Sequence, residues 1–268
     1  MSIINFSKVA SVYEKTALVQ KSASEVLLDL LSIKNGDDVL DVGCGPGNVS
    51  MEIAKMTKGR VVGIDVAPGM IEEACRRGTA SGNITFAVRD AADFEFISEF
   101  DVIFSNSAFQ WFRDPDVVIK RCFNALKLGG RMGIQAPATR NFCSNFVAAE
   151  EKIRSSPVTS GVFSDYRSPW LFLEKAEDYA RLFERNGFRV SYSQIVQEET
   201  LYSVDKAFRI YQSGAENGYL NQDYYQVLLS SDYVEMFREL FRESLSEQAR
   251  EDGMVPIVFN RIYLVAHK

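Results

Sequence analysis

The sequence predicts an α/β fold in which a doubly wound, mostly parallel, seven-stranded sheet carries a helical cap inserted late in the chain. Two observations predict it. Between residues 38 and 136, short apolar segments typical of buried strands alternate with segments of helical apolar spacing. After residue 137 the alternation stops, and two strand-like segments then flank a mostly helical stretch. Alternating strands and helices imply right-handed crossovers and a parallel sheet covered on both faces.

The first half of the chain supplies most of the predicted sheet. Residues 22–31 have helical apolar spacing, which a polar segment, LSIKNGDD, then breaks. Pro68 suits the first turn of a helix, where its missing N–H is not needed. Residues 127–130 (KLGG) are typical of a helix stop. The predicted strands are 38–42, 59–66, 84–89, 100–106 and 131–135, and the predicted helices between them are 49–56, 68–77 and 116–126.

The second half completes the sheet and adds the cap. Helical spacing covers residues 173–186 and ends at Gly187, 189–202 and 257–266 have strand character, and 204–249 are mostly helical. We therefore expect four parts. They are an N-terminal helical segment (1–32), a core (33–137), a cap (138–172 and 204–250) and two segments that complete the sheet (173–203 and 251–268).

Composition narrows the function. The net charge is −6 and the pI about 5.1, so the chain has no overall basic field for a nucleic-acid backbone, and we expect no nucleic-acid partner. The cysteines at 44, 75, 122 and 143 have no C-x-x-C spacing, which favours buried free thiols over a metal site or a redox pair. His267 is the only histidine, so histidine-based triads and multi-imidazole metal centres are disfavoured.

The location of the protein can also be predicted. The N-terminus, MSIINFSKVASVYEK, lacks the apolar core of a signal peptide, and no apolar run approaches the ~20 residues of a membrane span. We expect a cytoplasmic protein without a membrane partner, either a monomer or a homodimer. The length of 268 residues fits one large α/β domain with an insertion.

A glycine-rich turn follows the first predicted strand, in VLDVGCGPGNV (39–49). Gly43 and Gly45 permit tight or left-handed backbone, and Gly47 permits the close approach of a ligand or helix. The dinucleotide fingerprint G-x-G-x-x-G is absent because Asn48 fills the third position from Gly45, and no G-K-[ST] marks a phosphate-binding loop. The turn therefore predicts a nucleoside ligand other than a dinucleotide or a nucleoside triphosphate.

Acidic residues at the strand ends define that ligand further. Asp41 directly precedes the glycines, where a carboxylate disfavours phosphates and suits an ammonium group. Asp65 ends the second strand, at the spacing from which a carboxylate accepts hydrogen bonds from ribose hydroxyls. Asp90 follows the third strand, where it can accept from an adenine amino group. A ligand with a cationic end, a ribose and an adenine but no phosphates matches S-adenosylmethionine.

Several motifs together carry a family resemblance. DVGCGPG, GIDVAPGMI, the RDA turn, FSNSAFQW and LKLGG are similar to the motifs of class I S-adenosylmethionine-dependent methyltransferases, over residues 38–136. FSKVASVYEK, NSAFQW and NRIYLVAHK further resemble trans-aconitate methyltransferases and malonyl-acyl-carrier-protein O-methyltransferases. The resemblance implies a Rossmann-like methyltransferase fold, S-adenosyl-L-methionine as cofactor, S-adenosyl-L-homocysteine as product, and an N-terminal segment that covers the cofactor.

The resemblance also implies site residues. Asn106 would lie near the ammonium group. The full set expected at the cofactor is Tyr13, Asp41, Gly43, Gly45, Gly47, Asp65, Val66, Met70, Asp90, Ala91 and Asn106. At the acceptor we expect Gln110, Trp111, Arg167 and Arg261, with Arg140 as another candidate cation. Tyr13, Gln110 and Trp111 are the catalytic candidates. The cap aromatics are candidates for an apolar acceptor pocket or for ordinary packing: Phe142, Phe146, Phe163, Tyr166, Trp170 and Tyr211.

The chemistry expected is attack of an acceptor atom on the sulfonium methyl group. A carboxylate, with a pKa near 4, is already ionised at pH 7 and needs no base. Since no histidine lies near a motif, we expect an acid acceptor, small or bound to a carrier protein, and a methyl ester product. Two alternatives stay open. One is O-, N- or C-methylation of a phenol, an amine or a carbon acid, and the other is a sensor or partner protein that binds the cofactor without transferring methyl.

Overall fold

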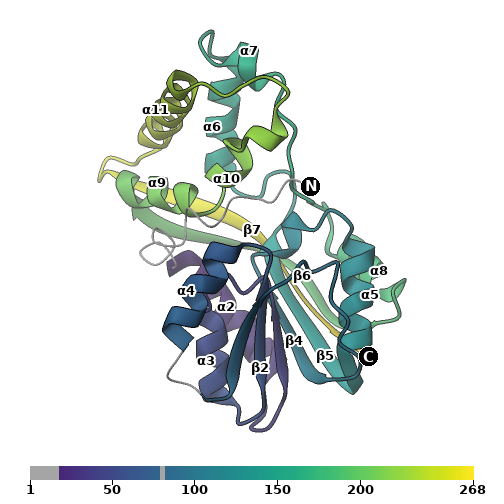
Figure 1. The fold of residues 1–268 in the computed structure, drawn as a ribbon. Coiled ribbons are helices and arrows are strands. Elements are labelled where there is room, and N and C mark those ends of the chain that lie inside the picture. Colours follow the sequence, from purple (N-terminus) through teal and green to yellow (C-terminus); the bar gives the residue numbers. More distant parts are fainter. Residues whose placement is uncertain (1–17, 79–81) are drawn as a thin grey trace.

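The predicted fold class is confirmed by the computed structural model, which describes residues 18–78 and 82–268. Seven strands form one sheet in the order β3-β2-β1-β4-β5-β7-β6 (Figure 1). All neighbouring strands run parallel except β7, which is antiparallel to both β5 and β6. The strand order reverses between β1 and β4, which is the place where open α/β sheets bind ligands.

The predicted strands all form, with shifted ends in most cases. β4 has the predicted bounds. The strands are β1 (Val39–Val42), β2 (Val61–Asp65), β3 (Ile84–Val88), β4 (Phe100–Asn106), β5 (Leu126–Pro137), β6 (Arg189–Ser203) and β7 (Met254–His267). The helices beside the sheet are α2 (Leu18–Leu31), α3 (Asn48–Met56), α4 (Pro68–Gly78), α5 (Pro115–Ala125) and α8 (Ala176–Glu184).

Two predicted boundaries are wrong. Residues 127–130 lie inside β5 and do not simply end a helix: α5 stops at Ala125, and Leu126 already pairs with Phe100. The register then shifts, so that the next pair is Val102 with Arg131, and Gly129 has a φ of +78°. The glycines therefore mark a bulge, and glycine is common at both bulges and helix ends. The helix expected over 173–186 is shorter, since α8 begins at Ala176.

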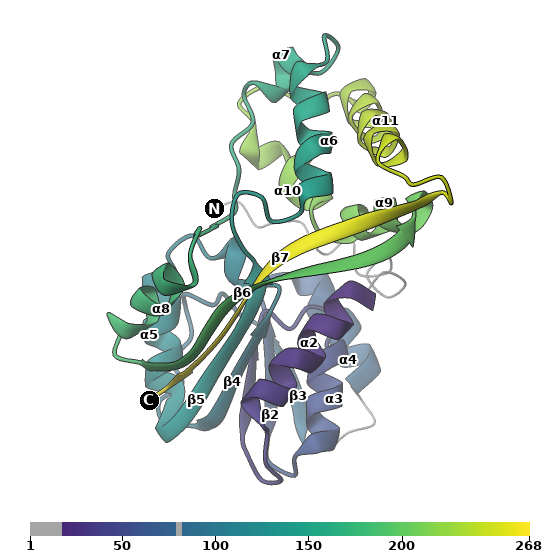
Figure 2. The ribbon, with the colours of Figure 1, turned by 180° about the vertical axis from the view of Figure 1, so that it is seen from behind.

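Helices cover both faces of the sheet. On one face, α2 and α3 bury Leu27, Leu31 and Ile53 against apolar strand residues that include Val102 and Phe104. On the other face, buried residues of α5 and α8 pack against alternate residues of the same strands. Figure 2 shows α2, α3 and α4 together on one side and α5 and α8 on the other. Strands such as β1, buried over its whole length, are apolar because both faces are covered.

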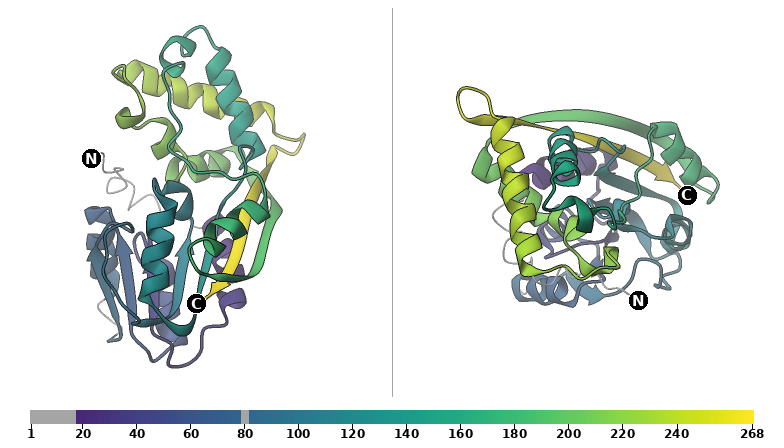
Figure 3. Two further views of the ribbon diagram at one scale, coloured as in Figure 1. Left: turned by 90° about the vertical axis from the view of Figure 1, so that its right-hand side faces the viewer. Right: turned by 90° about the horizontal axis from the view of Figure 1, so that it is seen from above.

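The remaining helices form a layer beyond one end of the sheet, which we call the cap (Figure 3). They are α6 (Ser144–Ser155), α7 (Ser160–Phe163), α9 (Val204–Ser213), α10 (Glu216–Tyr219), α11 (Ser231–Glu247) and the 3₁₀ turn η3 (Gln222–Tyr224). Their core is rich in aromatic residues, with the Tyr211 and Phe241 rings stacked at 3.7 Å between centroids. The paired strands β6 and β7 extend into this layer, and α9, α10 and α11 are inserted between them. The cap thus stands over the carboxyl ends of the parallel strands.

Gly47 offers a test of how the first turn fits the sheet. Its φ is +78°, and a Cβ there would lie 2.7 Å from the Phe86 ring and 3.0 Å from the Ala74 Cβ. Gly253 has a φ of +76° with nothing within 4 Å of such a Cβ, so it is a matched control. We expect Gly253→Ala to lower the free energy of unfolding by about 1–2 kcal/mol through backbone strain alone. Gly47→Ala should cost about 1–3 kcal/mol more through overpacking.

Urea denaturation of the two variants and the parent measures both values. Equal losses for the two variants would show that the close contact at Gly47 is relieved at no cost.

Candidate active site

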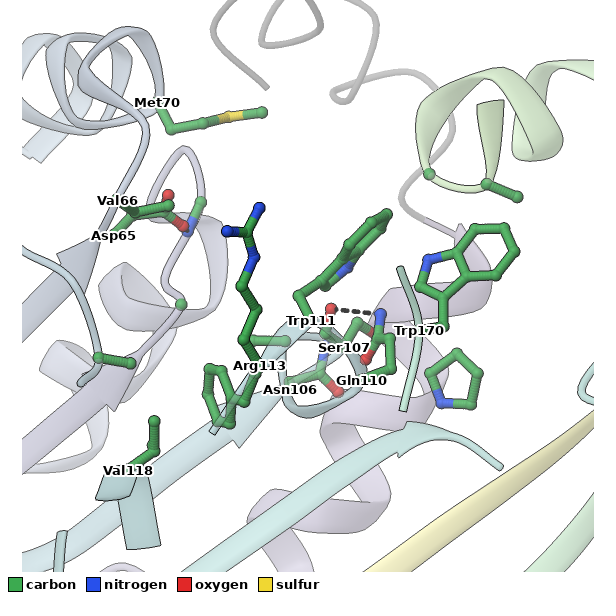
Figure 4. Close-up of a pocket in the computed structure, with 18 of the residues that line it drawn as sticks. Asp65, Val66, Met70, Asn106, Ser107, Gln110, Trp111, Arg113, Val118 and Trp170 are labelled. Carbon is green, nitrogen blue, oxygen red and sulfur yellow. Dashed lines mark hydrogen bonds between the residues drawn. The ribbon is translucent and has the colours of Figure 1, made fainter. Parts of the chain in front are cut away.

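A cavity of about 440 Å³ lies between the carboxyl ends of the parallel strands and the cap. Residues of the strand ends line one part of it, among them Gly43, Gly45, Asp65, Val66, Met70, Asp90, Ala91 and Asn106. Residues of the cap and of β7 line the other part, among them Phe142, Phe146, Trp170, Phe172, Ile210, Ala215, Phe259 and Arg261. Figure 4 shows the two parts facing each other across Trp111 and Arg113. The cavity therefore has two parts of different composition, one along the strand ends and one along the cap and β7.

The glycine turn after β1 forms one wall of the cavity. The N–H groups of Gly43 and Cys44 both donate to the carbonyl of Ile64, which ties the turn to β2. Gly43 has a φ of +78°, and a Cβ there would come within 2.3 Å of the Ala108 Cβ, so only glycine fits. Nothing lies within 4 Å of a Cβ built on Gly45, so the backbone itself faces the open cavity.

Asp65, at the end of β2, is fixed by the same turn. Its carboxylate accepts from the N–H of Gly45 and from the N–H of Ala67, both at 2.9 Å. Burial raises the pKa of the Asp65 carboxyl, and these backbone hydrogen bonds partly offset the increase. A carboxylate has about four lone-pair sites, so capacity remains on Asp65 for the hydroxyls of a ribose.

Asp41 and Gly47 do not line the cavity, so a direct role for them is not supported. Asp41 lies behind the turn, 2% exposed, and its carboxylate accepts from the Ser50 hydroxyl on α3. Burial raises the pKa of Asp41 to about 7, and the nearby negative charge of Asp65 adds to the increase. Gly47 lies against Phe86 and Ala74, where it allows α3 to pack closely. Both residues support the turn from outside the cavity.

The other predicted cofactor residues line the cavity beside Asp65. Asp90 is exposed and its carboxylate accepts from the Ala92 N–H at 2.9 Å, which holds the turn after β3 in place. Asn106 is held by the side chain of Gln135. When the Gln135 amide nitrogen faces Asn106, this nitrogen donates to Asn106 Oδ1 at 2.8 Å. Met70, 2% exposed, lines the same end from α4. Tyr13 lies outside the described residues.

The part of the cavity beside the cap is mostly aromatic. Gln110 and Trp111 belong to η2 (Phe109–Trp111), the 3₁₀ turn after β4. Trp111 meets Trp170 edge to face, with ring centroids 5.7 Å apart. The Trp170 ring packs so tightly over Gly218 that a Cβ there would lie 2.0 Å away. Of the six predicted cap aromatics, Phe142, Phe146 and Trp170 line the cavity, while Phe163, Tyr166 and Tyr211 belong to the core of the cap.

Arg261 places a buried positive charge in this apolar wall. It lies on β7 opposite Pro137, the last residue of β5, and is 2% exposed. Its Nε is 2.9 Å from Glu198 Oε2, and its guanidinium lies 4.5 Å from the centre of the Phe259 ring. Burial lowers the pKa of Arg261, and Glu198 opposes that change. An arginine stays protonated at any physiological pH, so the charge is permanent.

The sequence analysis misses two cations of the cavity wall, Arg89 and Arg113, and names two others that do not line the cavity. Arg113 lines the cavity and extends between Asp65 and Trp111 (Figure 4). Arg113 also interacts with the hydroxyl of Tyr224 in the cap. Burial raises the pKa of that hydroxyl, and the positive charge of Arg113 opposes the increase. Arg113 follows Trp111 by only two residues, and that proximity is the signal that could have found it. Arg140 and Arg167 do not line the cavity, and Arg167 is an exposed residue.

The residues present fit S-adenosylmethionine. The open backbone at Gly45 allows a ligand to approach closely, and Asp65 and Asp90 supply acceptors for a ribose and an adenine. The Asp65 carboxylate, which lines the cavity beside the turn, favours a cationic end group over a phosphate. Fold and site together define a Rossmann-like domain of the class I methyltransferase type.

Comparison with known families agrees with this class. Residues 39–130 match the family model described as "Methyltransferase domain". A malonyl-[acyl-carrier protein] O-methyltransferase of Acetivibrio thermocellus is 38% identical over 130 residues, which is 47% of this chain and 46% of that protein. A trans-aconitate 2-methyltransferase of Methylobacterium radiotolerans is 35% identical over 99 residues, 37% of each chain. These matches span about half or less of the relatives' length.

One relative matches along nearly the whole chain. An uncharacterized methyltransferase of Schizosaccharomyces pombe is 28% identical over 262 residues, 96% of each protein.

Solved structures share the fold. The YcgJ protein of Bacillus subtilis has a TM-score of 0.61 at 16% identity, over 92% of this chain and 98% of that one. A Haemonchus contortus phosphoethanolamine N-methyltransferase in complex with S-adenosyl-L-methionine has a TM-score of 0.57 at 20% identity, over 97% of this chain and 56% of that one. The [4+2]-cyclase SpnF has a TM-score of 0.57 at 18% identity, over 93% and 85%. The fold is therefore shared by proteins of more than one activity.

Two absences hold for the described part of the chain. No helix within residues 18–78 and 82–268 is long and apolar enough to cross a membrane. Within the same residues, no group of three or more His, Cys, Asp or Glu side chains could hold a metal ion.

The buried Asp41 carboxyl predicts a pH-dependent stability. In the folded protein its pKa is about 7 against an ordinary 3.8, so unfolding releases a proton between about pH 4 and 7. The free energy of unfolding therefore falls as pH rises through that window and is constant above it. Asp41→Asn does not titrate, so its stability relative to the parent should rise by about 3 kcal/mol between pH 5 and 8, at ~1.36 kcal/mol per pKa unit. Urea denaturation at the two pH values measures the difference, and parallel pH profiles would show that Asp41 is ionised throughout.

Proposed function

We propose that the protein transfers the methyl group of S-adenosylmethionine to the carboxylate of a small or carrier-bound acid and forms a methyl ester. The observation that carries the proposal is one continuous cavity with acidic residues and open glycine backbone at one end and a buried arginine in an aromatic wall at the other. The first end suits a cationic nucleoside, and the second suits an anion with an apolar body. The relatives named for malonyl-[acyl-carrier protein] and trans-aconitate methylation support an acid acceptor.

The residues of the chain would position the two reactants. Asp65 and Asp90 would hold the ribose and adenine, and Asn106 would lie near the amino acid end. Arg261 would orient the acceptor carboxylate from β7, while Trp111 and Trp170 exclude water between the two. When bound, S-adenosylmethionine supplies an electrophilic methyl group on a sulfonium. Alignment of the two reactants in a dry site accounts for much of the acceleration in such displacements.

The reaction needs no proton transfer. A carboxylate oxygen forms the new O–CH₃ bond while the C–S bond breaks and its electron pair stays on sulfur, so a neutral ester and a neutral thioether result. Both reactants lose charge on the way to the transition state, which a low-dielectric cavity favours. The cavity-lining acids Asp65, Asp90 and Asp114 leave a carboxylate base available, but an acid acceptor does not require one.

The cofactor assignment predicts the behaviour of Asp65→Asn. The variant loses charged acceptor capacity for the ribose and places an amide beside the Gly45 and Ala67 N–H groups. We expect the affinity for S-adenosylhomocysteine to fall roughly 10- to 100-fold, since hydrogen bonds to a charged group contribute about 1.5–3 kcal/mol. Asp90→Asn should lower the affinity for S-adenosylhomocysteine less than Asp65→Asn does, because Asp90 is exposed to solvent. Isothermal titration measures both, and tight binding of NAD or ATP with none of S-adenosylhomocysteine would contradict the assignment.

The acceptor assignment predicts the behaviour of Arg261→Gln. Removing a buried charge that pairs with the substrate should lower kcat/KM for acids roughly 30-fold or more. Arg167→Gln is the matched control and should change it little, since Arg167 is exposed and outside the cavity. Methyl ester formation from a panel of acids, measured by mass spectrometry, gives both values. Retained binding of S-adenosylhomocysteine shows that the Arg261 variant is folded.

A pH profile of the same reaction separates the alternatives. At saturating cofactor, the rate with a pre-ionised acid should be flat above about pH 6. A rate that rises from about pH 7 to 9 would indicate a phenol, amine or carbon acid as acceptor. Binding of S-adenosylhomocysteine without turnover on any acceptor would indicate a sensor or partner protein.

A further inference from the structure

We infer that Gln110 recognises a hydrogen-bond donor on the acceptor, so that the acceptor is an apolar acid with a hydroxyl or N–H group close to its carboxylate. The inference rests on the proposed function and narrows its class of acceptors. The starting observation is a buried acceptor atom in the cavity wall. Gln110 is 7% exposed and lines the cavity, and no group among the described residues donates to its Oε1.

The orientation of the Gln110 amide is fixed. Its Nε2 donates to the backbone carbonyl of Ser107 at 2.9 Å (Figure 4). A carbonyl can only accept, so the amide nitrogen must face Ser107 and the amide oxygen must face elsewhere. Ser107 holds its carbonyl there through a left-handed backbone, with a φ of +56°. Strained backbone of this kind persists where the surrounding structure imposes it, and it clusters at functional sites.

A buried oxygen without a donor is costly, and native proteins rarely leave one. The cost is removed when a ligand supplies the missing O–H or N–H. A carboxylate, which has no hydrogen at neutral pH, cannot do so. The donor must therefore come from another group of the bound molecule.

The position of Gln110 relative to Arg261 says where that group lies on the acceptor. Gln135 connects the turn that carries Gln110 to Arg261 when its side-chain amide nitrogen faces Ser107. The nitrogen then donates to Ser107 Oγ at 3.1 Å, and the amide oxygen accepts from Arg261 Nη1 at 3.1 Å. Ser107, Gln110 and Arg261 line the cavity, and Gln135, buried behind the wall, connects Ser107 to Arg261. An acid whose carboxylate lies at Arg261 brings its adjacent carbons along this wall toward Gln110.

Apart from Arg113, Asp114 and Ser213, the side chains around this part of the cavity are mostly apolar. They include Trp111, Trp170, Phe142, Phe172, Phe259 and Ile210. The acceptor body that fits these apolar side chains is a hydrocarbon chain or ring, since a second charged group placed among them, away from Arg113, would be desolvated without a partner. Recognition of a hydroxyl or N–H near the carboxylate and of an apolar tail beyond it defines the proposed acceptor.

A cofactor amino group is the competing source of the donor. Gln110 lies four residues beyond Asn106, within η2, and its own backbone carbonyl accepts from the Leu171 N–H at 2.8 Å, on the segment that follows Trp170. Gln110 is therefore held on the side of the cap. That placement favours the acceptor as the source.

The test compares acids that differ by one hydroxyl. Octanoate, 2-hydroxyoctanoate and 3-hydroxyoctanoate are assayed with saturating S-adenosylmethionine, for the parent protein and for Gln110→Met. We expect the parent to prefer one hydroxy acid over octanoate by roughly 10- to 100-fold in kcat/KM, because only that acid satisfies the buried oxygen. In Gln110→Met the preference should fall to about threefold or less. The affinity for S-adenosylhomocysteine should stay within about twofold of the parent, as expected if Gln110 serves the acceptor.

Each other outcome overturns the inference. Equal kcat/KM values for the three acids with the parent protein would contradict the inference. A preference for one hydroxy acid that persists in Gln110→Met would also contradict it. A loss of S-adenosylhomocysteine affinity with unchanged acid preference would assign the donor to the cofactor. Failure of the proposed function looks different: S-adenosylhomocysteine then binds, yet none of the three acids, nor any acid of the wider panel, is methylated.

Discussion

The hydrogen bond from the Gly45 N–H to the Asp65 carboxylate is the contact on which the site depends. It joins the turn after β1 to the end of β2, and the Gly43 and Cys44 N–H groups strengthen the same junction through the Ile64 carbonyl. A buried carboxylate is stable only when hydrogen-bonded, and here two backbone donors satisfy it. The negative charge is thereby held at the end of β2, beside the turn after β1. The cofactor end of the cavity follows from that charge and the open backbone beside it.

Much of the core could be predicted from the sequence because local chemistry decides it. Short strands covered on both faces must be apolar throughout, so β1, β2 and β4 can be recognised from their residues alone. Residues 127–130 are predicted wrongly because glycines occur both at helix ends and at β-bulges, and the local sequence does not distinguish the two. The bulge forms because this segment pairs with β4, which is distant in sequence. The same reasoning locates Asp65, Asp90 and Asn106, since the ends of parallel strands meet at one edge.

The residues that escape prediction are those whose position depends on tertiary packing. Asp41 is adjacent in sequence to the glycine turn, yet alternation along β1 directs it to α3 and Ser50, not to the cavity. The arginines give no local signal, because a solvated arginine and a buried one look alike in sequence. Arg261 is predicted through resemblance, but Arg167 is predicted with it and lies outside the cavity. Arg113 escapes prediction although it directly follows the cavity residue Phe112.

The antiparallel strand β7 explains how one sheet lines both parts of the cavity. The parallel strands direct their carboxyl ends, and hence the cofactor residues, to one edge of the sheet. β7 enters from the cap and passes that edge in the opposite direction, so Arg261 reaches it opposite Pro137 before the strand enters the sheet core. Because α9, α10 and α11 are inserted between β6 and β7, the cap is joined directly to the strand that carries Arg261. The cap helices can therefore change the apolar part of the cavity without disturbing Asp65, and the acceptor can diverge while the cofactor stays the same.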